Sequence, residues 1–319
     1  MSANRLPGKI NSDTTLIDIG MGDIRGVTAV YLIQASRKCL IDGGTRAEAS
    51  RLINKLKELD AFPPDLIIVT HPHWDHIQGI PLLQEEASRQ GKKIEIFASQ
   101  TAIPLLADAS FNNIYERGPC GPIRDVTPVK EGDAIDLGGI TLRIYEVPGH
   151  CQGHIALLDE KNRNIFVGDA LGNKIGDAFF TPPFMPPTWD PDAFLASVNK
   201  LKQIHYETLC LAHFGCISGD EARSILDESV DTYNTWWQLY ERHADRLSDI
   251  DYLLKVMRKE INPVLPEIKP ATFKQRFLLS LASAAGSVVG KKTALIDKLA
   301  LSDLLKWLAA GYRIHKNAP

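Results

Sequence analysis

The sequence predicts an α/β fold followed by a helical appendage. Over the first two thirds of the chain, short apolar runs typical of strands alternate with segments in which apolar residues have a helical spacing. Several of these runs are apolar throughout, which indicates strands that are buried on both faces between helices. Glycines follow some of them, as in "IDGG" at 41–44 and "GDALG" at 168–172. Loops at the ends of such strands are where functional sites are usually built.

Nine runs of this part are predicted as strands and two segments as helices. The helix over Ala47–Leu59 places three leucines on one face. The helix over Pro191–Ile204 begins with Asp190 as its N-cap and has a proline in its first turn. The predicted strands are Leu16–Ile19, Ala29–Gln34, Lys38–Ile41, Leu66–Thr70, Lys93–Phe97, Ile140–Val147, His154–Leu158, Asn164–Val167 and Thr208–Ala212.

After residue 219 the chain becomes rich in helix formers. Its first helix carries an apolar stripe spaced by three and four residues. The stripe consists of Leu226, Val230, Tyr233, Trp237 and Tyr240. We interpret the aromatic residues around Trp236 as helical core first and as a lid over a pocket second. The proline-rich stretch at 262–270 interrupts the helices, and two more are predicted over Phe277–Ala285 and Leu295–Leu308. These patterns divide the chain into residues 1–219 and a helical appendage of residues 220–319.

Length and composition exclude several classes of protein. The 319 residues are 44% apolar, enough for one large core or for a main domain with an appendage. The net charge of −3 leaves no basic stripe, so we expect no nucleic-acid partner. Five cysteines without a CxxC pair favour a reducing compartment. The N-terminus lacks an apolar export core, and the most apolar window, Phe277–Gly290, is too short to span a bilayer. We therefore expect a cytoplasmic protein without a membrane partner.

The stretch "VTHPHWDHIQG" at 69–79 carries the strongest chemical signal. It places His71, His73, Asp75 and His76 directly behind an apolar run. Buried imidazoles and a carboxylate would each need a hydrogen-bond partner, whereas a metal ion satisfies them together. His71 and His73 alternate along an extended turn and can meet one ion, while Asp75 and His76 lie further round the turn and can meet a second. Zinc, iron and manganese all accept such nitrogen and oxygen ligands.

This HxHxDH motif after an apolar strand resembles that of the metallo-β-lactamase superfamily, and the other motifs of that family occur in the expected order. "CLIDGGT" offers Asp42, as a residue that orients the motif loop rather than as a ligand. A "PGH" turn supplies His150, "IFVGDA" supplies Asp169, and "LCLAHFG" supplies His213. The resemblance covers roughly residues 13–216. It implies the αββα sandwich of that family, here with a C-terminal all-helical appendage.

The resemblance also implies a site for two divalent metal ions. One ion would be held by three histidines, the other by a carboxylate and two histidines, and a second carboxylate would bridge them. In that order the ligands are His71, His73 and His150; Asp75, His76 and His213; and Asp169. Zinc is the first expectation, with iron and manganese as alternatives. A hydroxide that bridges the ions would attack a carbonyl or phosphoryl centre, and Asp75 is the catalytic candidate to pass a proton to the leaving group.

Other residues near these motifs have plainer interpretations. His154, four residues after His150, is expected to support the ligands, with substrate contact as the alternative. Cys151 and Cys216 lie beside ligand positions and are expected to pack rather than to bind metal. The loop "FFTPPFMPPTW" at 179–189 is either plain packing or an apolar wall for a substrate.

The motifs leave several activities open. The leading hypothesis is a dinuclear hydrolase that cleaves a small-molecule thioester, ester or lactone in a pocket capped by the helical appendage. The alternatives are a phosphodiesterase, a single-iron persulfide dioxygenase, and a regulatory or binding protein that keeps the metal site for stability. Hydroxyacylglutathione hydrolases of the superfamily carry a Gly-Lys segment after the bridging Asp, and here Lys174 is the candidate for that role. A homodimer is also left open.

Overall fold

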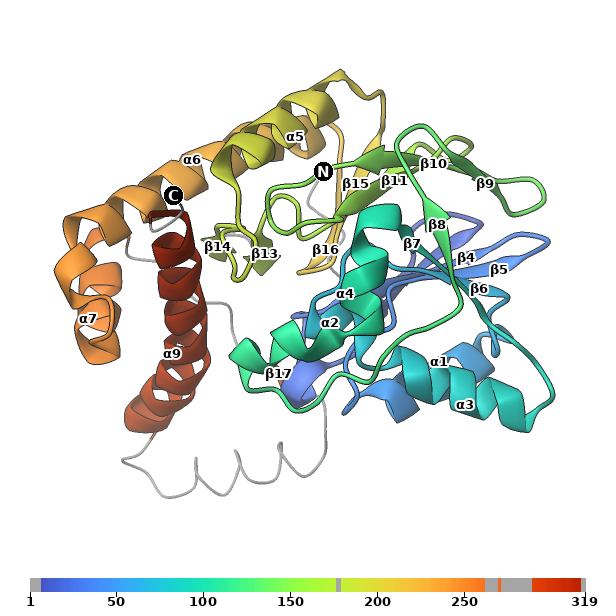
Figure 1. Cartoon of the computed structure of the whole chain (residues 1–319), viewed down its shortest axis with the longest axis horizontal. Coiled ribbons are helices and arrows are strands. Elements are labelled where there is room, and N and C mark those ends of the chain that lie inside the picture. The colour runs from blue at the N-terminus through green and yellow to red at the C-terminus, as the bar shows by residue number, and fades with distance from the viewer. Residues whose placement is uncertain (1–6, 176–178, 262–268, 271–288, 317–319) are drawn as a thin grey trace.

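The computed structural model describes residues 7–175, 179–261, 269–270 and 289–316. Two β-sheets lie face to face between outer helices (Figure 1). Helices α1 (Ala49–Glu58) and α3 (Ile80–Arg89) cover one outer side, and α5 (Pro191–Gln203) covers the other. Helices α6 (Glu221–Arg242), α7 (Ile250–Glu260) and α9 (Val289–Lys316) form the C-terminal part. The predicted αββα sandwich with a helical appendage is confirmed.

The first sheet has seven strands and runs from an antiparallel edge to a parallel one. Its order is β1-β2-β4-β5-β6-β7-β8, antiparallel as far as β5 and parallel beyond it. The carboxyl ends of the parallel strands are where open α/β sheets usually place their ligands. The strands are β1 (Gly8–Lys9), β2 (Thr14–Asp18), β4 (Ala29–Gln34), β5 (Lys38–Ile41), β6 (Leu66–Ile68), β7 (Glu95–Ser99) and β8 (Val126–Val129).

The second sheet has six strands in the order β16-β15-β12-β11-β10-β9. Only the β12 and β15 pair is parallel, which requires a crossover, and α5 lies in that connection. The strands are β9 (Ala134–Asp136), β10 (Thr141–Glu146), β11 (Ile155–Asp159), β12 (Asn164–Gly168), β15 (Thr208–Leu211) and β16 (Gly215–Ser218). Two small pairs join β13 (Asn173–Ile175) to β14 (Phe179–Thr181) and β3 (Ile24–Arg25) to β17 (Lys269–Pro270).

Alternating side chains bury both faces of the first sheet. In β4, Tyr31 and Ile33 pack in the layer between the sheets, whereas Val30 and Leu32 pack with the outer helices. Neighbouring residues of a strand point to opposite faces, so both sets are apolar and the run is unbroken in the sequence. From the second sheet, Phe166 meets Tyr31 with ring centres 5.1 Å apart. This layer fixes the distance between the two sheets whose ends carry the site.

The nine strands and two helices predicted for residues 1–219 are all found, each within two residues of its expected bounds. The largest displacement is that of β7, which begins at Glu95 because Lys92 and Lys93 are exposed in the loop before it. Asp190 caps α5 as predicted, its Oδ1 accepting from the amide of Ala193 at 3.0 Å. The remaining short helices are α2 (Trp74–Ile77), α4 (Ile103–Ala107) and the 3-10 helices η1 (Met21–Asp23), η2 (Gln100–Ala102), η3 (Ala109–Tyr115) and η4 (Ala244–Arg246).

The appendage packs on the second sheet through one hydrophobic layer. Trp236 and Tyr240 of α6 are fully buried there with Leu305 of α9 and Leu211 of β15. The interpretation of the α6 aromatics as helical core is confirmed, because Trp237 also packs against this layer. The same layer contains residues of α5 and of β12. The division of the chain at residue 219 stays a prediction.

Two expectations for the C-terminal part have different outcomes. The helix predicted over Leu295–Leu308 lies inside the longer helix α9, because no proline interrupts Val289–Lys316. The helix predicted over Phe277–Ala285 lies outside the described residues, as does most of the break at 262–270. In the part of the chain that the structure describes, no helix combines the length and the hydropathy that a bilayer crossing requires.

Candidate metal centre

The HxHxDH motif begins in the loop after β6, at the carboxyl end of a parallel strand, and ends in α2. His73 keeps extended backbone angles of φ −70° and ψ 152° as the last residue before α2. His71 also precedes the helix, whereas Asp75 and His76 lie in its first turn. All four residues are buried, and Asp75 is the least so, with 9% of the whole residue exposed. The change from extended chain to helix turns the two halves of the motif in different directions.

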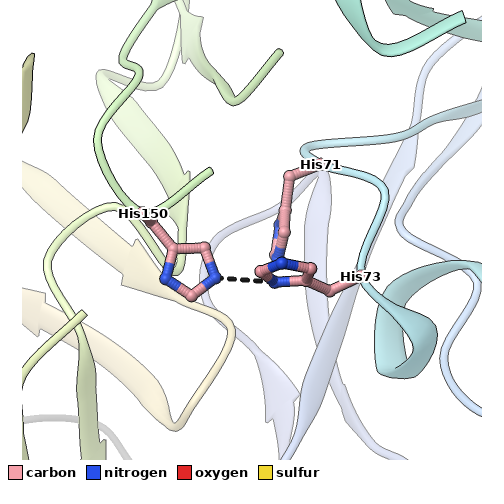
Figure 2. Close-up of side chains that lie close together, drawn as sticks. All are labelled: His71, His73 and His150. Carbon is pink, nitrogen blue, oxygen red and sulfur yellow. Dashed lines mark hydrogen bonds between the residues drawn. The ribbon is translucent and has the colours of Figure 1, made fainter. Parts of the chain in front are cut away.

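Three loops of the second sheet bring further ligand candidates to the motif. His150 follows β10, Asp169 follows β12, and His213 lies in the turn between β15 and β16. Ligand atoms within 4.8 Å of one another form three groups: His71, His73 and His150; Asp75, His76 and His213; and His71, His76 and Asp169. Figure 2 shows the first group, with the rings of His150 and His73 turned toward each other. All seven residues predicted as ligands are thus brought together, although their role as ligands stays a prediction.

Distances place Asp169 between the two predicted ligand sets. His150 Nε2 lies 2.8 Å from His73 Nδ1 in the first set. His213 Nε2 lies 3.1 Å from Asp75 Oδ2 in the second. Asp169 Oδ2 lies 3.8 Å from His150 Nε2 and 3.5 Å from His213 Nε2. One carboxylate therefore reaches both sets, which is the position that a bridging ligand needs.

Asp42 fixes the orientation of two of the motif histidines. Its Oδ2 lies 2.8 Å from His76 Nδ1 and accepts from the Thr70 hydroxyl at 2.8 Å. Because that hydroxyl gives its proton to Asp42, it must accept from His71 Nδ1, which lies 3.1 Å away. Asp42 Oδ1 also accepts from the amide of Thr70 at 2.8 Å. Asp42 thus has the contacts that the predicted orienting role requires, with Thr70 as an intermediary that the sequence reasoning missed, and the role itself stays a prediction.

The remaining three histidines are held by backbone carbonyls or by a tyrosine. His150 Nδ1 donates to the carbonyl of Pro183 at 2.7 Å, and His213 Nδ1 donates to that of Val27 at 2.8 Å. His73 Nε2 lies 3.3 Å from the hydroxyl of Tyr115. Each of the five histidines is therefore bonded through one nitrogen to an acceptor outside the cluster, which leaves the other nitrogen facing inward.

The loop at 179–189 has a role that side-chain chemistry did not suggest. Phe184 is fully buried and its ring packs 5.7 Å from that of Tyr240 in α6, so its side chain belongs to the core. The backbone carbonyls of Pro183 and Pro186 point the other way, to His150 and to Tyr115. Plain packing is the interpretation that fits Phe184, while the carbonyl of Pro183 contacts the predicted ligand His150 and that of Pro186 contacts Tyr115.

Burial and charge shift the pKa values of the histidines in the two ligand sets in opposite directions. Burial, with neighbouring histidines, holds the pKa of His71 and of His73 well below 6.5. Burial also lowers the pKa of His150. In the second set, burial acts downward on His76 and His213, but nearby carboxylates outweigh it and raise the pKa of both. The first set therefore presents neutral imidazoles at neutral pH, and the second holds protons in the metal-free protein.

The donor set fits metal ions better than it fits its own protein partners. His71 Nε2 is buried and has no hydrogen-bond partner among the described residues. His76 Nε2 and Asp169 Oδ1 are also buried without a hydrogen-bond partner among the described residues. They lie 3.5 Å from each other, which is beyond good hydrogen-bond distance. Buried polar atoms left without partners are costly, and a cation among inward-facing nitrogens and carboxylates removes that cost. Imidazole and carboxylate are ligands for zinc, iron and manganese alike.

His154 contacts the predicted ligands from outside the cluster, whereas the nearby cysteines are buried beside it. His154 Nε2 accepts from the amide of Asp169 at 3.1 Å, and its ring stacks on that of His71 with centres 4.6 Å apart. These contacts match the supporting role predicted for His154. Cys151 and Cys216 are buried, and neither belongs to a metal-ligand group among the described residues.

The segment that contains η3 braces the motif loop, and the sequence reasoning missed it. Asn112, which is buried, accepts from the amide of Trp74 at 2.9 Å and donates to the carbonyl of Pro72 at 3.0 Å. It thereby caps the start of α2 from outside that helix. Gln78 donates to the carbonyl of Arg117 at 3.2 Å. In the sequence, this segment shows only a tyrosine, Tyr115, and an asparagine, Asn112, in a stretch without regular spacing.

Comparison with known proteins decides the family. The family model described as "Metallo-beta-lactamase superfamily" matches residues 23–213, more than half of the chain and all seven predicted ligand positions. The chain belongs to the metallo-beta-lactamase superfamily. The resemblance inferred from the motifs is confirmed.

Curated relatives share the family over different spans. The hydroxyacylglutathione hydrolase of Methylobacterium nodulans is 35% identical over 124 residues, which cover 39% of this chain and 40% of that protein. Hydroxyacylglutathione hydrolase GloC of Haemophilus influenzae is 26% identical over 196 residues, which cover 58% of this chain and 84% of that protein. The chain thus spans less than half the length of the first of these relatives.

Solved structures share the fold at low identity. An archaeal metallo-beta-lactamase superfamily protein from Sulfolobus tokodaii has a TM-score of 0.54 at 22% identity, covering 69% of this chain and 85% of that one. The Rm3 metallo-beta-lactamase has a TM-score of 0.56 at 18% identity, covering 73% of this chain and 93% of that one. At these identities the comparison shows the fold alone.

Proposed function

We propose that this protein is a dinuclear metal-dependent hydrolase that cleaves a small-molecule thioester, ester or lactone. The observation that carries the proposal is the convergence of five histidines and two carboxylates, each histidine bonded outward through one nitrogen. The family and the names of the relatives, which are thioester hydrolases, support a hydrolase. The expectations of a cytoplasmic location and of a homodimer stay predictions.

The two ligand sets would hold the ions in the arrangement that the sequence implies. His71, His73 and His150 would hold one, the set around His76 would hold the other, and Asp169 would bridge. Bound zinc, or iron or manganese in its place, supplies Lewis-acid chemistry that lowers the pKa of water and polarises the bond under attack. The chain's own task is to keep one nitrogen of each histidine free for this purpose.

Asp75 is the residue that we propose to move the proton. Its Oδ2 lies 3.1 Å from His213 Nε2, which orients it within the second set. The side chain of Asp75 is 12% exposed, more than that of Asp169 at 7%, so it lies on the accessible side of the cluster. A carboxylate in that place can take a proton from water and pass it to a leaving group.

The residues around the metal centre favour a substrate that is recognised by an apolar acyl group rather than by a glutathione moiety. Lys174, the candidate for binding a glutathione carboxylate, is 5% exposed and pairs with Glu228 of α6. Its ammonium also lies 5.2 Å from the ring centre of Phe180, so it is engaged within the fold. Beside His73, by contrast, lie the rings of Phe111 at 6.2 Å and Tyr115 at 5.4 Å. Aromatic walls of this kind bind apolar groups.

We also propose that residues 220–319 cap the body formed by residues 1–219. Trp307 of α9 packs edge-on against Tyr115 with ring centres 5.3 Å apart. Arg117 Nη2 pairs with Asp303 Oδ2 of α9 at 2.5 Å. Both contacts lie on the side of the motif loop where the aromatic residues gather. The appendage would therefore close the apolar side of the substrate pocket.

Metal analysis joined to an activity panel tests the proposal. The full chain is loaded with Zn²⁺, Mn²⁺ or Fe²⁺, and its bound metal is counted. It is then assayed on S-lactoylglutathione, an acyl-coenzyme A, a p-nitrophenyl ester, an acyl-homoserine lactone and bis(p-nitrophenyl) phosphate. We expect two ions per chain and turnover of an ester, thioester or lactone with an apolar acyl group.

Each other outcome identifies an alternative. Two bound ions without turnover of any compound would leave the regulatory or binding protein. Turnover of the phosphodiester alone would make the protein a phosphodiesterase. One iron per chain, with oxygen uptake on glutathione persulfide, would make it a persulfide dioxygenase.

A further inference from the structure

Helix α9 reaches the HxHxDH loop through the segment that follows η3. Arg117 of this segment pairs with Asp303 of α9 at 2.5 Å. Its guanidinium lies between two indoles, 5.2 Å from the ring centre of Trp307 in α9 and 5.9 Å from that of Trp74 in the motif itself. Residues of α9 that lie more than 220 positions after the motif are thus connected to it by two side-chain contacts.

Tyr115 lies between α9 and the first ligand set. Its buried ring meets Trp307 edge-on at 5.3 Å on one side and His73 edge-on at 5.4 Å on the other. Its hydroxyl lies 3.3 Å from His73 Nε2 and donates to the carbonyl of Pro186. Tyr115 therefore touches a predicted ligand without being one of the seven predicted ligands itself.

The donors and acceptors around Tyr115 determine which nitrogen of His73 carries the proton. A tyrosine hydroxyl has one proton, and here that proton goes to Pro186, because a carbonyl can only accept. The hydroxyl must then accept from His73, so His73 carries its proton on Nε2. A neutral imidazole has one proton, which leaves Nδ1 free, and this is the atom that lies 2.8 Å from His150 Nε2 inside the cluster. The chain from His73 through Tyr115 to Pro186 thus keeps the inward nitrogen ready for an ion.

We propose that Tyr115 is a positioning residue for His73, and that α9 holds it in place through Trp307. The appendage would then do more than cover the pocket, since it would set the metal affinity of the set formed by His71, His73 and His150. This inference rests on the metal site of the proposed function. Outer partners of ligating histidines generally fix ring orientation, and their loss costs roughly 10- to 100-fold in metal affinity or activity.

Tyr115→Phe tests the hydrogen bond alone, because it keeps the ring and its contact with Trp307. Affinity for Zn²⁺ is measured by competition with a chromophoric chelator, and Co²⁺ is loaded to read ligand geometry from its visible absorption. We expect the affinity for one of the two Zn²⁺ ions to fall by about 10-fold or more. The affected ion is the more tightly bound one, or either one if the two bind equally. The Co²⁺ spectrum should also change. The matched control is Tyr240→Phe, since the buried Tyr240 also donates to a backbone carbonyl, that of Leu305 at 3.1 Å.

Equal Zn²⁺ affinity and an unchanged Co²⁺ spectrum in Tyr115→Phe and the wild-type protein would overturn the proposal for Tyr115. Weakening of the same size in Tyr240→Phe would overturn it too, because the loss would then reflect general destabilisation. If the wild-type protein itself binds no metal, the proposed function fails as well. If the wild-type protein binds two ions and Tyr115→Phe binds them with the same affinity and the same Co²⁺ spectrum, only this inference is refuted.

Trp307→Leu tests the part played by α9. We expect it to weaken Zn²⁺ binding in the same direction as Tyr115→Phe, because the tyrosine ring loses its outer support. The control is Trp237→Leu in α6, whose ring packs on Tyr312 of α9 at 4.6 Å without reaching the motif loop. Thermal unfolding of both variants checks that each is folded. Wild-type affinity in a folded Trp307→Leu protein would remove α9 from the proposal, whatever the result for Tyr115.

Discussion

His71, His73 and His150 form one half of the site, and the other half contains His76 and His213 with a carboxylate. The first half is oriented by groups that carry no charge of their own, namely a threonine hydroxyl, a tyrosine hydroxyl and a proline carbonyl. In the second half, carboxylates lie within 4 Å of both histidines. Burial lowers the pKa of the first three histidines, whereas the carboxylates raise the pKa of the other two against burial.

The opposite pKa shifts of their histidines distinguish two ion positions that are built from nearly the same ligand types. A neutral imidazole can bind a cation without first losing a proton, whereas a protonated one must release it. The first half is thus prepared for metal at neutral pH, and the second half exchanges protons for metal. Asp169, which lies near histidines of both halves, couples the two.

Removing the shared carboxylate should have the largest effect. Asp169→Asn keeps the size of the side chain but removes the charge that both halves use. We expect loss of at least one bound ion and a fall in kcat/KM beyond the roughly 100-fold that loss of an outer partner costs. Metal counting and steady-state kinetics measure both. Two retained ions with near-normal turnover would show that the halves work independently.

Replacing Asp75 should lower kcat without releasing the ion of the first half. Asp75→Asn removes the proposed proton carrier, and a fall in kcat of roughly 10²- to 10⁴-fold is expected, as for other general acid–base groups. The ion of the first half should stay bound, because Asp75 belongs only to the second group. Pre-loaded protein is compared with wild type by metal analysis and by kcat. Unchanged kcat would exclude Asp75 as the proton carrier.

Replacing Asp42 should weaken both halves together. Asp42→Asn disturbs the bond to His76 and, through Thr70, the bond to His71. We expect about a 10- to 100-fold loss of metal affinity at each position, measured by chelator competition. Asp190→Asn is the control, because it alters an aspartate that caps α5 far from the cluster. A loss confined to one ion would contradict the branched connection through Asp42.

The pH dependence of stability should reveal the two halves without any substrate. In metal-free protein, His71 and His73 have lowered pKa values, so the unfolded chain takes up more protons below pH 6.5 and stability falls as pH drops below that value. His76 and His213 have raised pKa values, so their contribution is full below pH 6.5 and is lost as pH rises through the folded values. Together these shifts predict a maximum of stability near pH 6.5.

Thermal unfolding in a chelating buffer, from about pH 5 to about pH 9, measures this maximum. Saturating Zn²⁺ should abolish the loss on the alkaline side, because metal then replaces the protons of the second half. Metal-free protein that becomes steadily more stable from pH 6.5 to about pH 9 would contradict the raised pKa of His76.

The layers of the fold and the ligand candidates could both be predicted from the sequence alone. Strands buried on both faces must be apolar throughout, so β4 and its neighbours were visible as unbroken runs. The spacing of His71, His73 and Asp75 was visible because side-chain chemistry is written directly in the chain. The order of the later motifs then predicted the family and the remaining candidates.

The inward-facing nitrogen of each histidine, and the group that holds the ring in place, could not be predicted without the packed structure. The carbonyls of Pro183 and Pro186 have no sequence signature, because every residue carries a carbonyl. Tyr115 and Asn112 lie in a segment without periodicity, and they reach the motif only because its backbone folds back across α2. Ligand identity is a local property of the chain, whereas ligand orientation depends on contacts between segments far apart, which exist only once the sheets and helices have packed.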